Sequence, residues 1–299
     1  MDEVATLRAF NRSYTQRIGV LAESYLGTGR ALGPSRLLFE IGADGARVAH
    51  VRRRLGLDSG YLSRMLRQLE GEGLVTVEDD PADGRQRVVR LSPAGRREWR
   101  RLDRRSQEVA RRLVEPLSAR QRGELTAALA RAERLLGAAT VDIAVVDPAS
   151  AAARTARARY FGELDARFPA GFDAAAGGGG DSDADGDGAA MRAPSGAFVL
   201  VRSGQDTVGC GGVQRIDDAT GEIKRMWIDP VWRGLGLGGR LLAHLEAVAR
   251  QLGRSRVVLD TNETLVEAIE MYERAGYRPI ERYNDNPYAQ RWFAKDLGA

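Results

Sequence analysis

The fold of the second half of the chain is decided by residues 221–253, GEIKRMWIDPVWRGLGLGGRLLAHLEAVARQLG. Alternation of polar and apolar residues over 222–228 predicts a strand. Leucine and valine at spacings of three and four over 241–252 predict a long amphipathic helix. Between the two lies the glycine-rich segment 233–239. The predicted order is therefore strand, glycine loop, helix.

This order of elements is suited to binding an anion. Glycines let backbone N–H groups approach phosphate oxygens closely, and the positive end of the helix dipole adds to the attraction. The loop is no dinucleotide fingerprint, because no parallel strand-helix-strand unit with a suitably spaced acidic residue follows it. It is no Walker loop either, because Gly-Lys-Ser/Thr is missing. The loop alone is weak evidence, so its neighbours matter.

The neighbouring segments complete a mixed α/β domain. Strands are predicted at 141–148, 196–203 and 207–217, the last two around a turn at Gly204. The Ala-rich stretch 149–168 predicts a helix with one aromatic and apolar side, formed by Tyr160, Phe161, Leu164 and Phe168.

From about residue 140 to 297 the chain resembles the GNAT superfamily of N-acetyltransferases, which use acetyl-coenzyme A (acetyl-CoA) as co-substrate. The resemblance lies in four motifs: Gly209-Cys210-Gly211, the strand 222–226, the Arg-x-x-Gly-x-Gly element 233–238, and the segment 268–277, AIEMYERAGY. It implies that the amides of 234–239 cradle the pyrophosphate and that the strand edge 226–228 holds the pantetheine arm. The coenzyme-binding residues it implies are Met226, Trp227, Ile228, Arg233, Gly234, Leu235, Gly236, Leu237, Gly238 and Gly239.

The same resemblance implies two catalytic residues and direct transfer of the acetyl group through a tetrahedral intermediate. Tyr272 stands where these enzymes keep a general acid for the departing thiolate, and Glu222 stands where histone-type members keep their base. Two alternatives stay open: Tyr272 as a packed helix residue, and Glu222 as an ion-pair partner of Lys224 or Arg225.

The coenzyme and acceptor sides contain further candidates. Many members have Asn seven residues before the tyrosine, where this chain has Leu265; Thr261 and Asn262 are expected to replace it as coenzyme contacts. The segment after Tyr283 resembles the closing strand of the fold, and Tyr283, Asn284 and Asn286 are expected to line the acceptor side. The acceptor itself is an unknown primary amine.

The first half of the chain predicts helices followed by a hairpin. Helices are expected at 8–26, after Pro34, and over 47–55. Asp58 is a good N-cap for a helix over 59–70, whose buried stripe is Leu62, Met65, Leu66 and Leu69. A hairpin follows over 74–92, with its turn at 79–85. This is the pattern of a winged helix-turn-helix module.

The winged segment resembles the MarR family of transcriptional regulators over about residues 5–137. The similarity lies in 58–75, DSGYLSRMLRQLEGEGLV, and in the wing signature from Asp79 to Gly95. It implies a homodimer on a palindromic DNA operator. The candidate DNA contacts are Ser59, Tyr61, Ser63, Arg64, Arg67, Arg85 and Arg87; the alternative is an ordinary solvated face.

Long amphipathic helices at both ends of the winged module, over 8–26 and after the wing, have more apolar surface than one copy covers, so the chain is expected to dimerise. Two of these helices follow the wing. One begins at Ser92-Pro93, and the other follows a capping box of Ser118 and Gln121.

Composition supports two domains with different electrostatic partners. The chain has 299 residues, about two domains of ordinary length. Residues 1–137 hold 26 Arg and 18 Asp or Glu, a net charge of +8; residues 138–299 hold 19 basic and 23 acidic residues, a net charge of −4. A basic half suggests a polyanion as partner.

The sequence argues against a membrane span, a secretory signal and a metal site. No apolar run is long enough for a membrane span, and the acidic start of the chain differs from a secretory signal, so we expect a cytoplasmic protein. One cysteine and two histidines exclude a structural zinc site. Asp181, Asp183 and Asp185 imitate a calcium loop, but its twelfth position is Arg192, so no metal is expected.

The sequence therefore predicts an α+β protein with two domains. Residues 1–137 form an N-terminal all-helical winged helix-turn-helix domain with dimerisation helices. Residues 138–299 form an α/β GNAT fold with a mixed central sheet and a flexible loop over 174–196. Three functions fit: a regulator joined to a working acetyltransferase, a regulator whose second half only senses acetyl-CoA, and an acetyltransferase whose winged half only dimerises.

Overall fold

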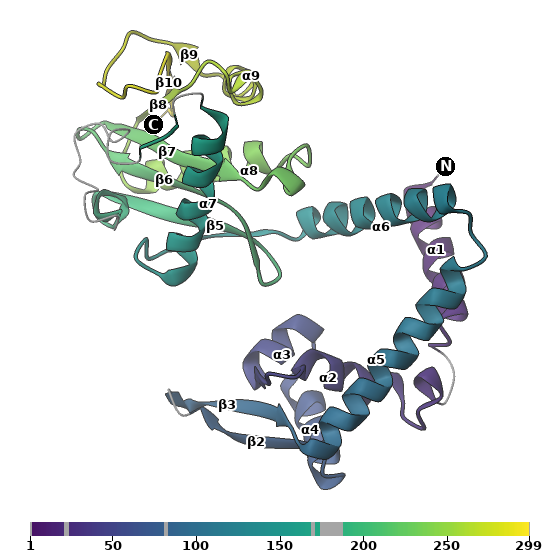
Figure 1. The fold of residues 1–299 in the computed structure, drawn as a ribbon. Coiled ribbons are helices and arrows are strands. Elements are labelled where there is room, and N and C mark those ends of the chain that lie inside the picture. The colour runs from purple at the N-terminus through teal and green to yellow at the C-terminus, as the bar shows by residue number, and fades with distance from the viewer. Residues whose placement is uncertain (1, 21–23, 81–82, 169–170, 174–187, 299) are drawn as a thin grey trace. The chain divides into compact units, whose positions relative to one another are not determined.

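The computed structural model describes residues 2–20, 24–80, 83–168, 171–173 and 188–298. The chain forms two compact units, Met1–Ala127 and Ala128–Ala299. They divide within helix α6 (Ala119–Ala139), about ten residues before the predicted boundary at 137 (Figure 1).

The first unit is a set of helices with a small sheet. Its elements before α6 are α1 (Glu3–Arg17), the 3-10 helix η1 (Tyr25–Gly27), α2 (Leu32–Ile41), β1 (Ala46–Arg47), α3 (Val48–Leu55), α4 (Ser59–Gly71), β2 (Val75–Asp80), β3 (Asp83–Leu91) and α5 (Pro93–Val114). The hairpin β2–β3 is antiparallel, and β1 pairs with β3, so the sheet order is β1-β3-β2.

The predicted helix caps and the buried stripe of α4 are confirmed. Asp58 accepts a hydrogen bond of 2.8 Å from the backbone N–H of Tyr61. The four stripe residues are at most 5% exposed and pack in one core with residues of α2, β2, β3 and α5. Ser118 and Gln121 form the capping box, with a bond of 2.9 Å from the Ser118 backbone N–H to the Gln121 side chain.

The first helix differs from the prediction of 8–26. Helix α1 starts at Glu3 and ends at Arg17. Gly19 has φ of 69°, a left-handed conformation that ends helices. Spacings of three and four in the sequence place Phe10, Tyr14, Ile18, Leu21 and Tyr25 on one helical face; in the structure Phe10 and Tyr14 lie on α1, Ile18 is its C-cap and Tyr25 lies on η1, while Leu21 lies outside the described residues.

The second unit is built on a seven-stranded sheet in the order β4-β5-β6-β7-β8-β10-β9. Its strands are β4 (Asp142–Val146), β5 (Gly196–Ser203), β6 (Asp206–Arg215), β7 (Thr220–Ile228), β8 (Arg256–Thr261), β9 (Arg278–Pro279) and β10 (Arg291–Asp296). All neighbours are antiparallel except β7 and β8, which are parallel. The expected mixed sheet is confirmed.

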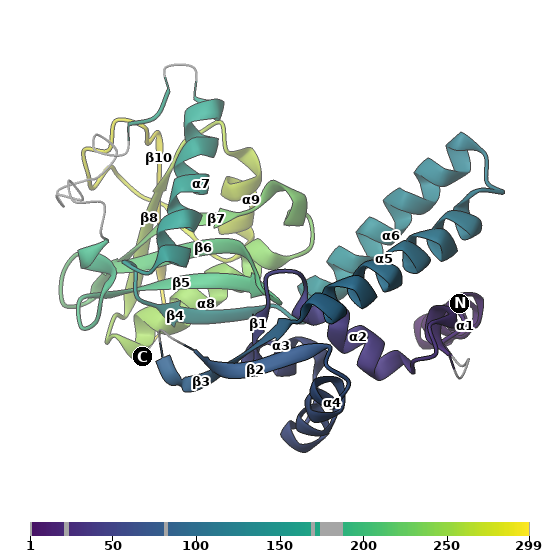
Figure 2. The ribbon, with the colours of Figure 1, turned by 60° about the horizontal axis from the view of Figure 1, so that its bottom comes forward.

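Helices cover both faces of this sheet (Figure 2). Helix α8 (Leu237–Gln251) packs on one face, where Leu241 and Leu245 share a core with Val199 and Val201 of β5. On the other face α7 (Ala151–Arg167) packs against the alternate residues of β5. Helix α9 (Val266–Arg274) joins the α8 side through Tyr272, and the 3-10 helix η4 (Pro230–Trp232) precedes the glycine loop.

Strand β7 does not keep the simple alternation that the sequence predicts. Arg225 has φ of 55°, and the pairing with β6 shifts between Cys210 and Gly212. The bulge inserts one residue, so every later side chain changes face. Met226 and Ile228 therefore lie with Ile223 on the α8 side, and not with Glu222 as alternation predicts.

The predicted flexible loop over 174–196 needs a correction at its end. Residues 189–191 form the 3-10 helix η3, and Met191 is 1% exposed beneath the sheet. Burial of this side chain holds the segment in place. Residues 174–187, with the three aspartates of the calcium-like stretch, lie outside the described residues.

Neither a metal cluster nor a membrane-spanning helix is present among the described residues. They contain no group of three His, Cys, Asp or Glu side chains placed to hold a metal ion. None of the helices in the described ranges is long and apolar enough to cross a membrane.

Candidate active site

A cleft of about 610 Å³ lies where β7 ends and α8 begins. It is lined by β7, the glycine loop, α7 and α9. Ten of the predicted residues meet here: Met226, Trp227, Ile228, Arg233, Gly234, Gly236, Leu237, Gly238, Gly239 and Tyr272. Leu235 is not among the lining residues and packs against the core.

The glycine loop presents the N-terminus of α8 to this cleft. Gly234 and Gly236 have φ of 73° and 76°, values that favour glycine. Gly236 is the N-cap and supplies no side-chain bond, so the N–H groups of the first turn have no partner within the helix. A Cβ atom on Gly236 would meet nothing within 4 Å. The loop thus combines unpartnered N–H donors with a position on the cleft wall, as an anion site requires.

Strands β7 and β8 separate beside the cleft. Their parallel pairing covers only Thr220–Glu222 against Arg256–Val258, although both strands are described to their ends. Beyond Glu222 the edge of β7 is unpaired with β8, and the cleft-lining residues 226–228 follow on that edge.

Glu163 of α7 binds three other residues of the cleft wall, and the sequence did not predict this role. Its carboxylate accepts hydrogen bonds of 2.6 Å from Arg233 and 2.7 Å from the indole N–H of Trp227, and it is 2.9 Å from Arg167. Burial opposes ionisation, but the bonds from Arg233 and Trp227 hold the pKa of Glu163 below its usual value. A lone glutamate on a helix gives no sequence signal for contacts with residues 64 and 70 positions away.

Tyr272 of α9 lines the cleft, while its ring packs in the core of the second unit. It is 7% exposed, and its ring lies 5.8 Å from Tyr277 and 6.2 Å from Phe293, measured between ring centroids. The hydroxyl group has no hydrogen bond to any described residue. Burial, with a contribution from Asp260, raises the pKa of Tyr272. The side chain therefore stays protonated at neutral pH and is in the form that donates a proton.

Glu222 lies outside the lining of the cleft, in a polar cluster on the α7 side of the sheet. It is 4% exposed and accepts from Gln214 (2.8 Å), Tyr283 (2.9 Å) and Asn284 (3.3 Å). Lys224 lies 3.4 Å away, so one of the two open ion-pair alternatives is present. Expected acceptor residues Tyr283 and Asn284 thus surround Glu222.

Asn286 belongs to the same cluster, whereas Thr261 and Asn262 are not among the residues that line the cleft. Asn286 donates to Asp260 at 3.0 Å. Asn262 instead fixes its own turn, donating to the Tyr288 carbonyl (2.9 Å) and accepting from Thr264. Thr261 is 8% exposed at the end of β8. Leu265, the departure from the family pattern, itself lines the cleft.

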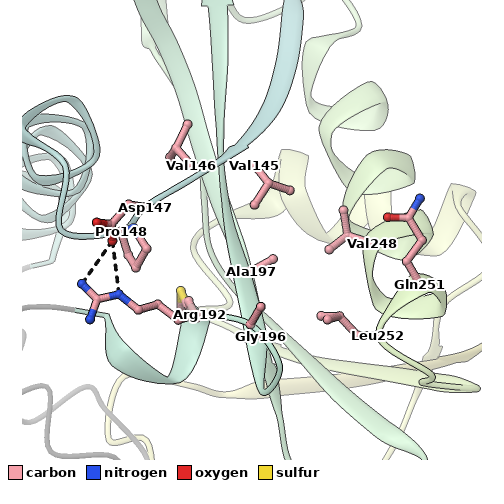
Figure 3. Close-up of a pocket in the computed structure, with 12 residues that line it drawn as sticks. Val145, Val146, Asp147, Pro148, Arg192, Gly196, Ala197, Val248, Gln251 and Leu252 are labelled. Atoms are coloured by element: carbon pink, nitrogen blue, oxygen red, sulfur yellow. Dashed lines mark hydrogen bonds and ion pairs between the residues drawn. The ribbon is translucent and has the colours of Figure 1, made fainter.

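A second pocket of about 560 Å³ lies beside β4 and the end of α8 (Figure 3). Its walls are largely apolar, with Val145, Val248 and Leu252 among them. Its two charged residues, Asp147 and Arg192, are paired at 3.1 Å. The pocket has no arrangement of side chains suited to acid-base chemistry.

In the first unit the candidate DNA contacts form the exposed face of α4 and part of β3. Ser59, Tyr61, Ser63, Arg64 and Arg67 are all exposed, opposite the buried stripe. The Arg64 guanidinium lies 5.8 Å from the Tyr61 ring centroid. Arg85 and Arg87 lie on β3, where Arg87 is exposed.

Comparison with protein families gives one match in each unit. Residues 167–277 match the Acetyltransferase (GNAT) family, and residues 29–86 match the MarR family.

The chain is also similar to curated acetyltransferases over its second half. It is 34% identical to an uncharacterized N-acetyltransferase of Schizosaccharomyces pombe over 96 residues, which are 31% of this chain and 59% of that protein. It is 33% identical to an IAA acetyltransferase of Azospirillum brasilense over 98 residues, 31% of this chain and 64% of the relative. The chain thus spans about three fifths of the length of these relatives.

Solved structures resemble each half separately. A GNAT-family acetyltransferase from Staphylococcus aureus is 19% identical with a TM-score of 0.46, over 53% of this chain and 99% of that one. MarR from Escherichia coli is 21% identical with a TM-score of 0.37, over 44% of this chain and 97% of that one.

Proposed function

Because the chain joins a MarR-family region to a GNAT-family region, we propose that it is a DNA-binding regulator joined to an acetyl-CoA-dependent N-acetyltransferase of a primary amine. The observation that carries the enzymatic half is the cleft at the N-terminus of α8, with a glycine cradle at one end and Tyr272 among its walls. We assign the first function to residues 1–137 and the second to 138–299.

The cleft fits acetyl-CoA by its chemistry. Residues 237–239 line the cleft at the positive end of α8, and their N–H groups have no partner within the helix, which suits a pyrophosphate. Three arginines, Arg167, Arg233 and Arg274, line the walls with two glutamates, Glu163 and Glu267, so the lining carries net positive charge. Met226 and Ile228 give the unpaired β7 edge an apolar surface for the pantetheine arm. Acetyl-CoA supplies the activated acetyl group as a thioester.

The transfer we propose is direct, from the thioester to the amine. Tyr272 gives its proton to the departing sulfur, since its raised pKa keeps the hydroxyl protonated. An acetyl-enzyme through Cys210 is disfavoured, because this thiol is fully buried and burial raises its pKa to about 12.

The first unit fits DNA through charge and shape. Helix α4 presents its polar face to solvent and its apolar stripe to the core, as a recognition helix in the major groove does. The net charge of +8 over residues 1–137 suits a polyanion.

We also propose a homodimer, on a palindromic operator. Helix α1 exposes Val4, Leu7, Phe10 and Tyr14, and α6 exposes Leu129, Leu135 and Leu136. Large apolar side chains exposed in rows on helices are typical of surfaces that a partner covers.

Release of free coenzyme A thiol from acetyl-CoA, measured with a panel of primary amines, tests the enzymatic half. We expect Tyr272→Phe to lower kcat by about 10²-fold or more and to leave acetyl-CoA affinity within about twofold, because the ring packing is kept. Coenzyme binding without thiol release from any amine would favour a pure sensor. Retention of operator-sized DNA at low salt separates a regulator from an enzyme whose winged half only dimerises.

A further inference from the structure

Two carboxylates, Glu222 and Asp260, lie on the same face of the sheet as the expected acceptor residues. They differ in how many hydrogen bonds each of their oxygens accepts. Val257 and Leu259 of β8 point into the α8 core, so Asp260 points to the other face. Glu222 points to that same face, opposite Ile223. The amide nitrogen of Asn284 bridges them, at 3.3 Å from Glu222 and 2.7 Å from Asp260.

Glu222 is poorly placed to accept a proton from a substrate. Both oxygens already accept hydrogen bonds, from Gln214 on one side and from Tyr283 and Asn284 on the other. Lys224 lies against it as well, and only 4% of the residue is exposed. Oε1 accepts two hydrogen bonds and Oε2 one, so an incoming amine would find room only on an oxygen that is almost fully buried.

Asp260 has one carboxylate oxygen that accepts no hydrogen bond from the described residues. One oxygen, Oδ2, accepts from Asn284 and from Asn286 at 3.0 Å. The other, Oδ1, accepts from no described residue, and the side chain is partly exposed. Asp260 also lies two residues beyond the last β7–β8 pair, Glu222 with Val258, where the strands have separated.

Asp260 is not among the residues that line the cleft, but its negative charge acts on two tyrosines that are. Burial is the main cause of the raised pKa of Tyr272, and the negative charge of Asp260 is the second. The pKa of Tyr160, another lining residue, is raised by burial, by Tyr272 and then by Asp260. The free carboxylate oxygen thus belongs to a residue that acts electrostatically on the cleft's proposed proton donor.

We propose that Asp260 binds the ammonium group of the acceptor and takes its proton, and that Glu222 is a positioning residue that holds Tyr283 and Asn284. The inference rests on the proposed function. It defines the acceptor as an amine that arrives as a cation, received by a cluster in which two carboxylates face one lysine.

Asp260 takes one proton from the ammonium, and the freed nitrogen lone pair forms the C–N bond to the thioester carbonyl carbon. The C–S bond breaks with its electron pair on sulfur, which takes the Tyr272 proton. Tyr272 recovers a proton from the new amide nitrogen, and Asp260 releases its own to solvent. The products are one amide, one thiol and one proton.

The test compares Asp260→Asn with Glu222→Gln and with the control Asp285→Asn, which removes a fully exposed carboxylate next to Asn284 and Asn286. Asn at 260 keeps the size and an oxygen that can accept from Asn284 or Asn286. We expect kcat/KM at pH 7 to fall by about 10²-fold or more in Asp260→Asn, by less than tenfold in Glu222→Gln, and not at all in the control.

The pH profile separates a base from a residue that only holds the loop. In Asp260→Asn the deficit should shrink as the pH rises, because the fraction of free amine increases and needs no base. A loss that is equal at every pH would assign Asp260 a structural role. A profile and rate equal to the unmutated protein would overturn the proposal, as would a larger loss in Glu222→Gln.

A binding measurement gives a readout that does not depend on turnover. Benzylammonium is titrated calorimetrically into the protein saturated with coenzyme A. We expect binding at least tenfold weaker in Asp260→Asn than in the control. Equal affinity in the two variants, or no binding by the unmutated protein, contradicts an ammonium site at Asp260. Failure of the proposed function appears separately, as absence of acetyl-CoA binding or of thiol release.

Discussion

Adding one methyl group at Gly209 should disturb both the sheet and the coenzyme cleft, whereas the same change at Gly211 should disturb neither strongly. Both glycines lie on β6. A Cβ atom on Gly209 would lie 2.6 Å from Ile228 Cδ1 and 2.7 Å from the Trp227 carbonyl oxygen. On Gly211 it would lie 2.9 Å from Leu245 Cδ1, with the next atom at 3.6 Å.

The difference in cost follows from what has to move. Ordinary contact begins at 3.4 Å, so the Trp227 oxygen, a backbone atom of β7, must retreat by about 0.7 Å (3.4 minus 2.7). The methyl group facing Gly211 is the end of a flexible side chain and moves by rotation. Overpacking costs about 1–3 kcal/mol. We expect about 3 kcal/mol for Gly209→Ala and about 1 kcal/mol or less for Gly211→Ala.

Hydrogen exchange of peptides from β6 and β7, read by mass spectrometry, measures this cost within the second unit alone. Ile228 also lines the cleft, so its displacement in Gly209→Ala should weaken acetyl-CoA binding about tenfold, which is about 1.4 kcal/mol. Gly211→Ala should bind as the unmutated protein does. Equal protection and equal affinity in the two variants would refute the packing argument.

Three further predictions concern charges. Lys295→Met should destabilise the second unit by about 3–5 kcal/mol in urea unfolding, because Glu246, 6% exposed and bound at 2.8 and 2.9 Å, loses its partner. Arg64→Ala should weaken binding to operator-sized DNA in an anisotropy titration and reduce the slope of log affinity against log salt by about one; an unchanged slope would exclude a phosphate contact. The folded-state pKa of Glu163 is lowered, so its contribution to stability is present at neutral pH and is lost as the pH falls below the ordinary glutamate value of 4.5. Glu163→Gln should flatten that part of the stability profile in denaturation at a series of pH values, and a profile that keeps its shape would show that the contacts with Arg233 and Trp227 do not stabilise the carboxylate.

Local patterns in the sequence predicted the parts of the fold that depend on neighbours in the chain. The stripe of α4, the cap at Asp58 and the glycine loop before α8 each follow from residues within one or two turns. The resemblance to known families then placed Tyr272 beside the loop, and the structure brings both to one cleft.

Long-range contacts account for what the sequence did not predict. The bulge at Arg225 puts an ordinary residue in a left-handed conformation, so no composition signal marks it, and the alternation of β7 changes face there. Glu163 and Asp260 gain their environments from α7, the glycine loop and the segment 283–286, which lie far away in the chain. A carboxylate on a helix or strand looks the same in sequence whether solvent or a guanidinium faces it.

The central claim is that the N-terminus of α8 binds the phosphates of acetyl-CoA, and calorimetric titration of the protein with acetyl-CoA tests it most directly. Gly236→Val is compared with Gly253→Val, since both glycines have left-handed φ, 76° and 81°, and open space around them, but Gly253 lies at the far end of α8. We predict saturable binding at one equivalent per chain that is retained in Gly253→Val and lost in Gly236→Val. Absence of binding by the unmutated protein, or equal binding by both variants, would contradict the account.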